Sequence, residues 1–326
     1  MSRRAVLVTG SSAYLGAQTV AALQRRADLA VVGLDLRAPA LRLPGVGYEL
    51  QDIRAPQVDA IVARHRPDVV VHLASIVTPG RNSSRDFEYD VDVNGSRNLL
   101  QACVRHGVGR IIVSSSGAAY GYHADNPAWL CETDPVRGND AFAYACHKRL
   151  VEEMLLEYRE REPQLQQIVL RIGTILGATV RNQITDLFEK RRIIAIAGCD
   201  SPFVFVHDQD VVGAIVHGVD SAQTGIFNLA GDGKLGIHEI AQRLGKTCLV
   251  LPAGVLQSAL WLLKRLQLTQ YGPEQLDFLR YRPVLCNTRL KQEFGYVPKL
   301  SSAQVFDLYV SARARAGAGG GAEAGP

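Results

Sequence analysis

Tyr144 and Lys148 lie four residues apart in a segment with helical periodicity, residues 144–160, so their side chains share one helix face. An ammonium group close to a phenol stabilises the phenolate and lowers the pKa of the tyrosine. Such a tyrosine can accept or donate a proton while a hydride moves at the same carbon. By itself the pair is common, and a solvent-exposed helix face would be the ordinary interpretation.

A run of three serines, Ser114 to Ser116, provides hydroxyl groups that the same chemistry needs to hold a substrate oxygen. The run ends a strand-like apolar segment, residues 110–114. Ligands of open α/β sheets bind at the carboxyl ends of the strands. The serines therefore favour the catalytic interpretation of Tyr144 and Lys148, provided that a nucleotide site lies upstream.

Residues 6–16 supply that site, because they read as a strand, a glycine-containing turn and the start of a helix. A turn of this kind presents backbone amides at a helix N-terminus, where the helix dipole favours a pyrophosphate. Gly10 permits the tight turn, and Gly16 lets the helix pack on the strand. We assign to the same cofactor site the residues Ser12, Ala13, Tyr14 and Leu15.

Asp35 ends the second strand, 25 residues after Gly10. A carboxylate at this place accepts hydrogen bonds from ribose hydroxyls and repels a 2′-phosphate, so NAD is favoured over NADP. Leu36 and Arg37 follow within the expected cofactor site, and Arg37 is the residue that would bind a 2′-phosphate instead.

The elements that must position these residues alternate along the first half of the chain. Strand-like runs rich in Val, Ile and Leu occupy residues 5–9, 30–34, 68–73, 110–114 and 168–171, and helical patterns lie between them. Continuous rather than alternating apolar runs are typical of a parallel sheet buried on both faces. The chain is therefore expected to be an α/β protein with a Rossmann-type doubly wound parallel sheet and a smaller C-terminal substrate-binding lobe.

Further motifs are distributed along most of the chain. They include Asp52-Ile53, His72-Leu73-Ala74, Asn94, the segment from Ser114 to Gly121, Phe203 to Asp208, Gly225 to Gly231 and Phe294 to Pro298. With Thr9, Gly10, Gly16, Asp35, Tyr144 and Lys148 they resemble the NAD-dependent epimerase/dehydratase family of extended short-chain dehydrogenases/reductases, over about residues 5–310.

The resemblance implies a role for each matching residue. Tyr144 would be the acid/base, Lys148 would hold the nicotinamide ribose and lower the pKa of Tyr144, and Ser116 would orient the substrate oxygen. It implies a homodimer built on the helices before residue 107 and after Tyr144. It adds to the NAD site the residues Asp52, Ile53, Leu73, Ala74, Ser75, Asn94, Ser114 and Arg171, and to the substrate site Gly117 and Arg282. Tyr122 and His123 are assigned to the substrate site because they follow on a loop near it.

Departures from the family pattern bear on the substrate. Ala13 replaces the middle glycine of the phosphate turn, and its methyl group is expected to loosen or shift NAD. Gly117 and Ala118 follow Ser116 where dehydratases carry an acid, which argues against elimination of water. Ser201-Pro202 replaces an Arg-Asp pair, and Arg171-Ile-Gly-Thr174 has no asparagine, so two contacts to a nucleotide diphosphate are missing.

Two kinds of alternative stay open. The reaction is either epimerisation, which returns the hydride, or oxidation, which does not, and the substrate is either a sugar or a non-nucleotide alcohol such as a lipid, sterol or natural product. An NAD-sensing protein without turnover is a third interpretation, although such proteins tend to lose the tyrosine or lysine that this chain keeps.

Composition limits the partners. The 326 residues carry a net charge of +4 without a basic stripe, so a small-molecule substrate is expected rather than a nucleic acid, and no residue spacing suggests a metal. Six scattered cysteines and the absence of a secretory leader predict a cytoplasmic location. The apolar stretch 251–268 is too short and polar for stable membrane insertion, and its residues 255–268 are expected to be a packed helix.

The expected domain organisation has three parts. Residues 1–170 form the NAD-binding domain, to which residues 203–220 return. Residues 171–202 and 221–312 form the substrate-binding lobe. The Ala/Gly-rich end, residues 313–326, is expected to be a disordered tail.

Overall fold

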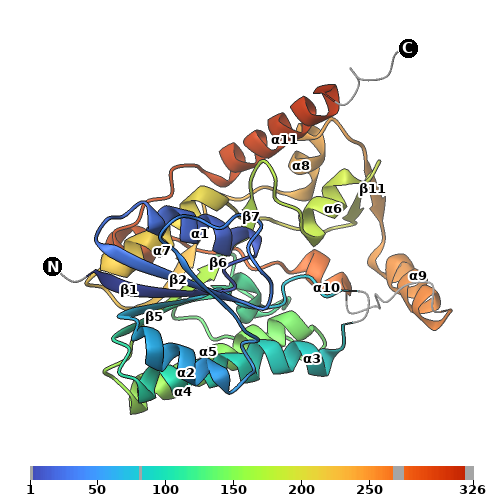
Figure 1. Ribbon diagram of the computed structural model, residues 1–326. Helices are drawn as coiled ribbons and strands as arrows, with labels where there is room; N and C mark the ends of the chain where they lie inside the picture. Colours follow the sequence, from blue (N-terminus) through green and yellow to red (C-terminus); the bar gives the residue numbers. More distant parts are fainter. Residues whose placement is uncertain (1–2, 81–82, 267–274, 320–326) are drawn as a thin grey trace.

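The computed structural model describes residues 3–80, 83–266 and 275–319. Its centre is a seven-stranded sheet in the order β10-β6-β5-β4-β1-β2-β3, with every neighbouring pair parallel (Figure 1). The strands are β1 Arg4–Thr9, β2 Leu29–Asp35, β3 Gly47–Leu50, β4 Val69–His72, β5 Arg110–Ser116, β6 Gln166–Ile172 and β10 Gly225–Leu229.

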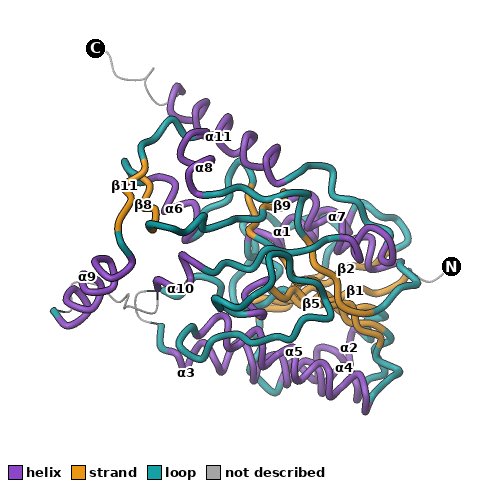
Figure 2. The backbone as a smooth tube through the Cα atoms, turned by 180° about the vertical axis from the view of Figure 1, so that it is seen from behind, coloured by secondary structure: helices purple, strands orange, loops and turns teal. Residues whose placement is uncertain are grey.

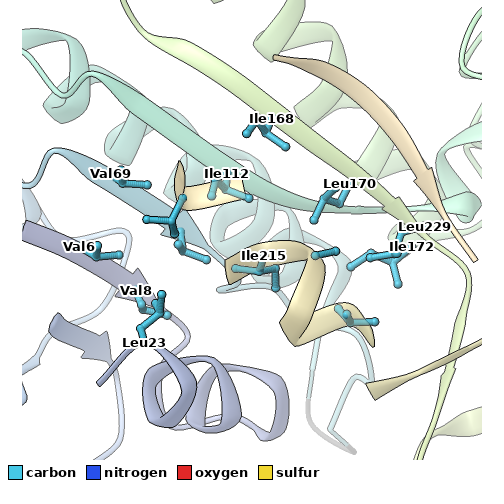
Figure 3. Packing of buried hydrophobic residues seen from close by; sticks show 14 of the residues in the cluster. Val6, Val8, Leu23, Val69, Ile112, Ile168, Leu170, Ile172, Ile215 and Leu229 are labelled. Carbon is cyan, nitrogen blue, oxygen red and sulfur yellow. The ribbon is translucent and has the colours of Figure 1, made fainter. Parts of the chain in front are cut away.

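Helices cover both faces of this sheet, as the uninterrupted apolar strands predict. On one face, α1 (Tyr14–Gln24) and α7 (Asp208–Asp220) pack over Val6, Val8 and Ile112 (Figure 3). On the other face, α2 (Gln57–His65), α4 (Gly95–Arg105) and α5 (Ala143–Arg161) pack over Leu7 and Ile111. Successive strand residues thus point to opposite cores, which fixes the register of the whole sheet.

The connections at the carboxyl edge of the sheet carry most of the predicted site. They include the turn between β1 and α1, a 3-10 turn at Gly117–Tyr120 after β5, and α3 (Arg85–Tyr89) followed by a π-helical turn at Asp90–Asn94. Because all seven strands run in the same direction, these connections gather at one edge.

The smaller lobe contains two two-stranded parallel sheets, in which β7 (Thr174–Leu176) pairs with β9 (Phe205–His207) and β8 (Ile193–Ile196) pairs with β11 (Cys248–Leu251). Phe188, Phe203, Phe205, Phe306 and Tyr309 fill its core. Its helices are α6 Gln183–Glu189, α8 Ile237–Arg243, α9 Ala253–Arg265, α10 Gln275–Arg280 and α11 Ser302–Gly319, with a further π-helical turn at Leu290–Phe294 (Figure 2).

Three features differ from the sequence-based expectations. Strand β10 is an edge strand of the large sheet, although the sequence pattern assigns residues 221–312 to the lobe. Helix α11 extends to Gly319, so residues 313–319 are helical rather than disordered, because alanine is the best helix former and this stretch is rich in it. The rest of the expected tail, residues 320–326, lies outside the described residues.

Helix α9 is the third difference. None of its residues whose side chains the structure describes is fully buried. Leu256 and Leu260 are half-buried and α9 contacts α10, so the helix is packed on one side only, not throughout as the apolar pattern predicts. Residues 267 and 268 of the expected helix lie outside the described residues. Within the described ranges, no helix is both long and apolar enough to cross a bilayer. All six cysteines are free thiols.

Candidate active site

Strand β5 and helix α5 bring the three predicted catalytic residues together. Ser116 is the last residue of β5, and Tyr144 and Lys148 lie in the first two turns of α5. The Nζ of Lys148 donates to the carbonyl of Ser114 at 2.9 Å and lies 5.5 Å from the centroid of the Tyr144 ring. The hydroxyl of Ser116 accepts from the backbone N–H of Ala118 at 3.1 Å, which fixes it at the start of the 3-10 turn.

Burial dominates the electrostatics of this group. It raises the pKa of Tyr144 to about 12, and a hydrogen bond with Ser116 opposes the rise. Burial also lowers the pKa of Lys148, which Asp92 and Glu152 partly restore. The phenol is therefore neutral at pH 7 in the chain by itself, and the lowered pKa expected from its spacing to Lys148 is not found there.

The turn between β1 and α1 has the close packing that a phosphate site needs. Gly10 has a φ of 69°, and a Cβ atom there would lie 2.8 Å from the backbone nitrogen of Ala74. A Cβ at Gly16 would lie 2.0 Å from the carbonyl oxygen of Gly10. Helix α1 begins without an acidic residue in its first turn, so its amides and dipole suit a pyrophosphate.

Asp35 connects this turn to the end of β2. One of its carboxylate oxygens accepts from the backbone N–H of Ser12 at 2.9 Å, and the other accepts from the backbone N–H of Arg37 at 3.0 Å. Ser12 in turn donates its hydroxyl to the carbonyl of Arg37 at 2.7 Å. The carboxylate is thereby held beside the phosphate turn, in the position from which it can accept from a ribose.

Ala13 and its neighbours belong to the predicted cofactor site as well. Ala13 has a φ of −76°, so its side chain brings no backbone strain. The hydroxyl of Tyr14 hydrogen-bonds Asp208 at the start of α7 and accepts from Thr179 at 3.1 Å, so it joins α1 to the other lobe. Leu15 packs against the sheet core, and the side chain of Leu36 is 67% exposed.

The residues expected near the adenine form a second group at the same edge. Arg54 binds Asp52 at 2.7 Å and Asp90 at 3.0 Å, and it holds the pKa of Asp52 below its usual range. Ile53 is buried beneath α4, where a Cβ at Gly95 would come within 2.7 Å of it. Asn94, in the π-helical turn, donates to Asp90 at 3.0 Å.

The end of β4 provides the floor of the site. The backbone N–H groups of Leu73 and Ala74 bond to the carbonyl and hydroxyl of Thr9 at 3.2 and 3.3 Å, and the hydroxyl of Ser114 donates to the carbonyl of His72 at 3.2 Å. Ser75 is next to them, and its buried hydroxyl has no partner among the described residues.

Sequence reasoning missed a buried polar cluster beneath Lys148. His72 bonds Thr9 at 2.7 Å and Ser96 at 2.9 Å, and burial lowers its pKa to about 3, so it is neutral. Asp92 pairs with His147 at 3.2 Å. Lys148, Asp92 and Ser96 line a cavity of about 10 Å³, the size of a single water. The polar residues from Asp90 to Ser96 were the feature of the sequence that could have indicated this cluster.

Arg171 is not brought to the cofactor turn. Its guanidinium makes several bonds to the carboxylate of Glu152, the shortest at 2.6 Å, and it also donates to the hydroxyl of Tyr120 at 2.8 Å and the carbonyl of Glu132 at 3.3 Å. Both members of the Arg171–Glu152 pair are buried. Because all three of its nitrogens already have protein partners, Arg171 is a structural residue here.

The predicted substrate residues divide into two kinds. His123 bonds the carbonyl of Arg137 at 2.7 Å, and Gly117 faces Leu285, so both serve the local packing. Tyr122 is buried beside Tyr144, with edge contacts to Phe142 and Phe278 at centroid distances of 5.2 and 5.1 Å.

Arg282 is the most informative of the predicted substrate residues. Its guanidinium carbon lies 4.0 Å from the ring centroid of Phe203 and 4.1 Å from that of Phe278. Its Nε and one terminal nitrogen are buried and have no partner among the described residues. Burial lowers its pKa to about 10, so it is still charged at pH 7. A desolvated cation with free donors fits an anionic ligand group.

A doubly wound sheet with a glycine phosphate turn, a strand-end acid and a Ser–Tyr–Lys group at its carboxyl edge defines an NAD-binding enzyme of the short-chain dehydrogenase/reductase type. The model of the NAD dependent epimerase/dehydratase family matches residues 6–230. The chain therefore belongs to this family, and it is an NAD-dependent enzyme.

Individual relatives are more distant. An uncharacterized protein of Mycobacterium tuberculosis is 25% identical over 320 residues, which cover 95% of this chain and 84% of that protein. The UDP-glucose 4-epimerase of Erwinia amylovora is 31% identical over 191 residues, 55% of this chain and 56% of that enzyme. The structure of Thermus thermophilus UDP-glucose 4-epimerase in complex with NAD is 25% identical, with a TM-score of 0.72, and covers 94% of this chain and 98% of that one.

Proposed function

We propose that this enzyme epimerises a sugar nucleotide at a secondary alcohol carbon. The observation that carries the proposal is the buried, partly unpartnered guanidinium of Arg282, which interacts with Tyr122, the neighbour of Tyr144. A cation at this place suits a phosphate-bearing substrate whose reacting sugar reaches Tyr144. The similar UDP-glucose 4-epimerases act on substrates of this chemical class.

Each residue of the site would have a separate role in such a reaction. The β1–α1 turn and Asp35 would hold NAD, which would supply the hydride acceptor and donor for the carbinol carbon. Tyr144 removes the hydroxyl proton as the carbon–hydrogen bond breaks, and gives the proton back when that bond forms again. Ser116, which hydrogen-bonds Tyr144, would hold the reacting oxygen. The charge of Lys148, 5.5 Å from the Tyr144 ring, would favour the phenolate form. Inversion would require the hydride to return to the opposite face of the same carbon.

Elimination of water is less well supported than epimerisation. It would need an acid beside Ser116, but Gly117 and Ala118 follow it and both are buried. Leu285 packs against Gly117 at this point. The chain therefore has no carboxylate next to Ser116 in sequence that could protonate a leaving hydroxyl.

A dehydrogenase of a non-nucleotide alcohol is the second candidate. It is favoured by the aromatic lining of the site, formed by Tyr122, Phe142 and Phe278, and by Ser201-Pro202 in place of a basic residue.

We also infer a cytoplasmic enzyme, from its six free thiols, and a homodimer that pairs through α4 and α5.

Product analysis with UDP-galactose tests the proposal. Conversion to UDP-glucose without net formation of NADH is expected, and the Arg282→Gln variant should raise KM at least about tenfold while kcat changes less. The matched control is Arg289→Gln. Arg289 is partly exposed, pairs with Glu293 at 2.7 Å and lies beside Phe227 of the sheet core, so its charge is not part of the predicted substrate site.

The outcomes separate the candidate functions. Net NADH formation with a free alcohol, and no reaction with UDP-galactose, would support the dehydrogenase and contradict the epimerase. NAD that stays bound through purification would support the epimerase, which must keep its cofactor. Equal turnover by the Arg282→Gln and Arg289→Gln variants would remove the argument for an anionic substrate.

A further inference from the structure

Helix α9 carries apolar side chains that the described part of the protein leaves exposed. Val255, Leu262 and Leu266 are 56%, 50% and 57% exposed, and Trp261 is 53% exposed. Positions 255, 262 and 266 are seven and four residues apart, so they form one stripe along the helix. The helix stands at the outer end of the small lobe, away from the large sheet (Figures 1 and 2).

The strand pair that leads into α9 extends this uncovered surface. Ile194 on β8 and Leu249 on β11 are register partners, and they are 47% and 39% exposed. Val250 follows and is 49% exposed. Large apolar side chains gathered on one element and the strands next to it are characteristic of an interaction surface.

Charge distinguishes between the possible occupants of this surface. From Leu244 to Pro273 the sequence contains Lys246, Lys264 and Arg265 but no Asp or Glu. Lys190, Arg191 and Arg192 are exposed immediately before β8, and the ammonium of Lys246 donates to the carbonyl of Lys190 at 2.9 Å. The uncovered apolar residues are therefore flanked by basic residues at both ends.

The arrangement of α9 is that of a helix lying in a membrane interface. The guanidinium of Arg265 lies 5.4 Å from the ring centroid of Trp261, beside the apolar stripe. Leucine on one face, with tryptophan and basic residues on the flank, is typical of helices that bind anionic lipid surfaces. We propose that α9, with the β8–β11 pair, docks this enzyme on an anionic lipid bilayer without spanning it.

A second copy of the chain fits this surface less well. The 13 residues of α9 extend for only about 20 Å, too little for the roughly 800 Å² per partner of a stable protein interface. The facing copy would also bring the exposed run Lys190 to Arg192 to a like-charged surface, because the neighbouring acid Glu189 is already paired with Arg313 at 2.9 Å. Anionic lipid headgroups supply the opposite charge.

Vesicle sedimentation tests the proposal with the full chain. The protein is expected to bind vesicles of phosphatidylcholine with about one-third phosphatidylglycerol, to bind pure phosphatidylcholine much less, and to dissociate at high salt. The Leu262→Ser/Leu266→Ser variant should lose binding by roughly tenfold or more. The matched control is Leu308→Ser on α11, which removes an apolar side chain that is 49% exposed and lies outside both the α9 surface and the helices of the proposed dimer.

Tryptophan fluorescence gives a second measurement, because Trp261 and Trp129 are the only tryptophans of the chain. In a Trp129→Phe background, anionic vesicles should shift the Trp261 emission to shorter wavelength. The same NAD affinity and melting temperature for the leucine variant and its parent would show that the variant is folded.

Three results would overturn the proposal. These are no binding to anionic vesicles, equal binding by the α9 variant and the Leu308→Ser control, and a change of oligomeric mass in the α9 variant without lipid. The last result would show that the surface pairs two copies of the chain.

Discussion

Tyr144 is a neutral phenol in the protein by itself, because burial raises its pKa to about 12. A phenol in this state is a poor base at pH 7. Lys148 places a cation next to this phenol, because its Nζ is 5.5 Å from the ring centroid and is fixed by the carbonyl of Ser114. Activation of Tyr144 therefore depends on positive charge in the loaded site, to which Lys148 contributes directly.

Removal of that charge should change the pH profile. Oxidation of the substrate alcohol requires phenolate, so kcat rises with pH through the pKa of Tyr144. A cation favours the phenolate and lowers this pKa, so Lys148→Met should move the rising limb to higher pH. The measurement is kcat against pH for both proteins. An unchanged limb would show that the charge of Lys148 does not act on Tyr144.

Asp35 should determine the choice of cofactor. Its carboxylate is held by Ser12 and Arg37, and a 2′-phosphate would be repelled there. We expect tighter binding of NAD than of NADP, and a rise of about tenfold in the NADP-to-NAD affinity ratio for Asp35→Asn. Calorimetric titration of both cofactors measures the ratio. Tighter binding of NADP than of NAD by the natural chain would contradict the prediction and would indicate that Arg37 binds the 2′-phosphate.

At the scale of elements, the β1–α1 turn depends on the absence of a side chain at Gly16. A methyl group there would lie 2.0 Å from the carbonyl oxygen of Gly10, so Gly16→Ala should weaken NAD binding at least about tenfold and lower the melting temperature. Ala13→Gly is the matched change in the same turn. Because Ala13 is unstrained at a φ of −76°, it should alter NAD affinity much less. If Gly16→Ala and Ala13→Gly changed NAD affinity equally, the turn would not depend on the absence of a side chain at Gly16.

The Arg171–Glu152 pair joins β6 to α5 inside the protein. Arg171→Met leaves the Glu152 carboxylate buried without its partner, so we expect a loss of about 3–5 kcal/mol in the free energy of unfolding. Urea denaturation measures it. Arg243→Met breaks the partly exposed pairs with Glu239 and Asp307 and should cost less than about 1 kcal/mol. If Arg171→Met changed the free energy of unfolding only slightly but greatly weakened NAD binding, Arg171 would be a cofactor residue, as the sequence predicts.

The elements predicted best from the sequence were those with a strong local signal. The apolar strands, the glycine turn and the Tyr144–Lys148 spacing each follow from contiguous residues. The role of Arg171 could not be predicted, because its partner Glu152 lies on another element and only the fold brings the two together. The cluster of His72, Asp92 and His147 was missed for the same reason.

At the scale of the whole molecule, the least predictable feature was which apolar surface stays uncovered. The pattern of α9 is the same whether its apolar stripe packs on the lobe or faces outward, and only the tertiary structure shows that it is uncovered. The net charge of +4 likewise concealed a basic, acid-free segment from Leu244 to Pro273. Composition averages over such local differences.

The central claim is that Tyr144 moves the proton in an NAD-dependent reaction at the carboxyl edge of the sheet. The most direct measurement is the rate of nicotinamide reduction in the NAD-loaded protein after mixing with UDP-galactose, for the natural chain and for Tyr144→Phe. We predict that the variant binds NAD equally well but reacts about 10²–10⁴ times more slowly. Equal rates for the two proteins would contradict the claim.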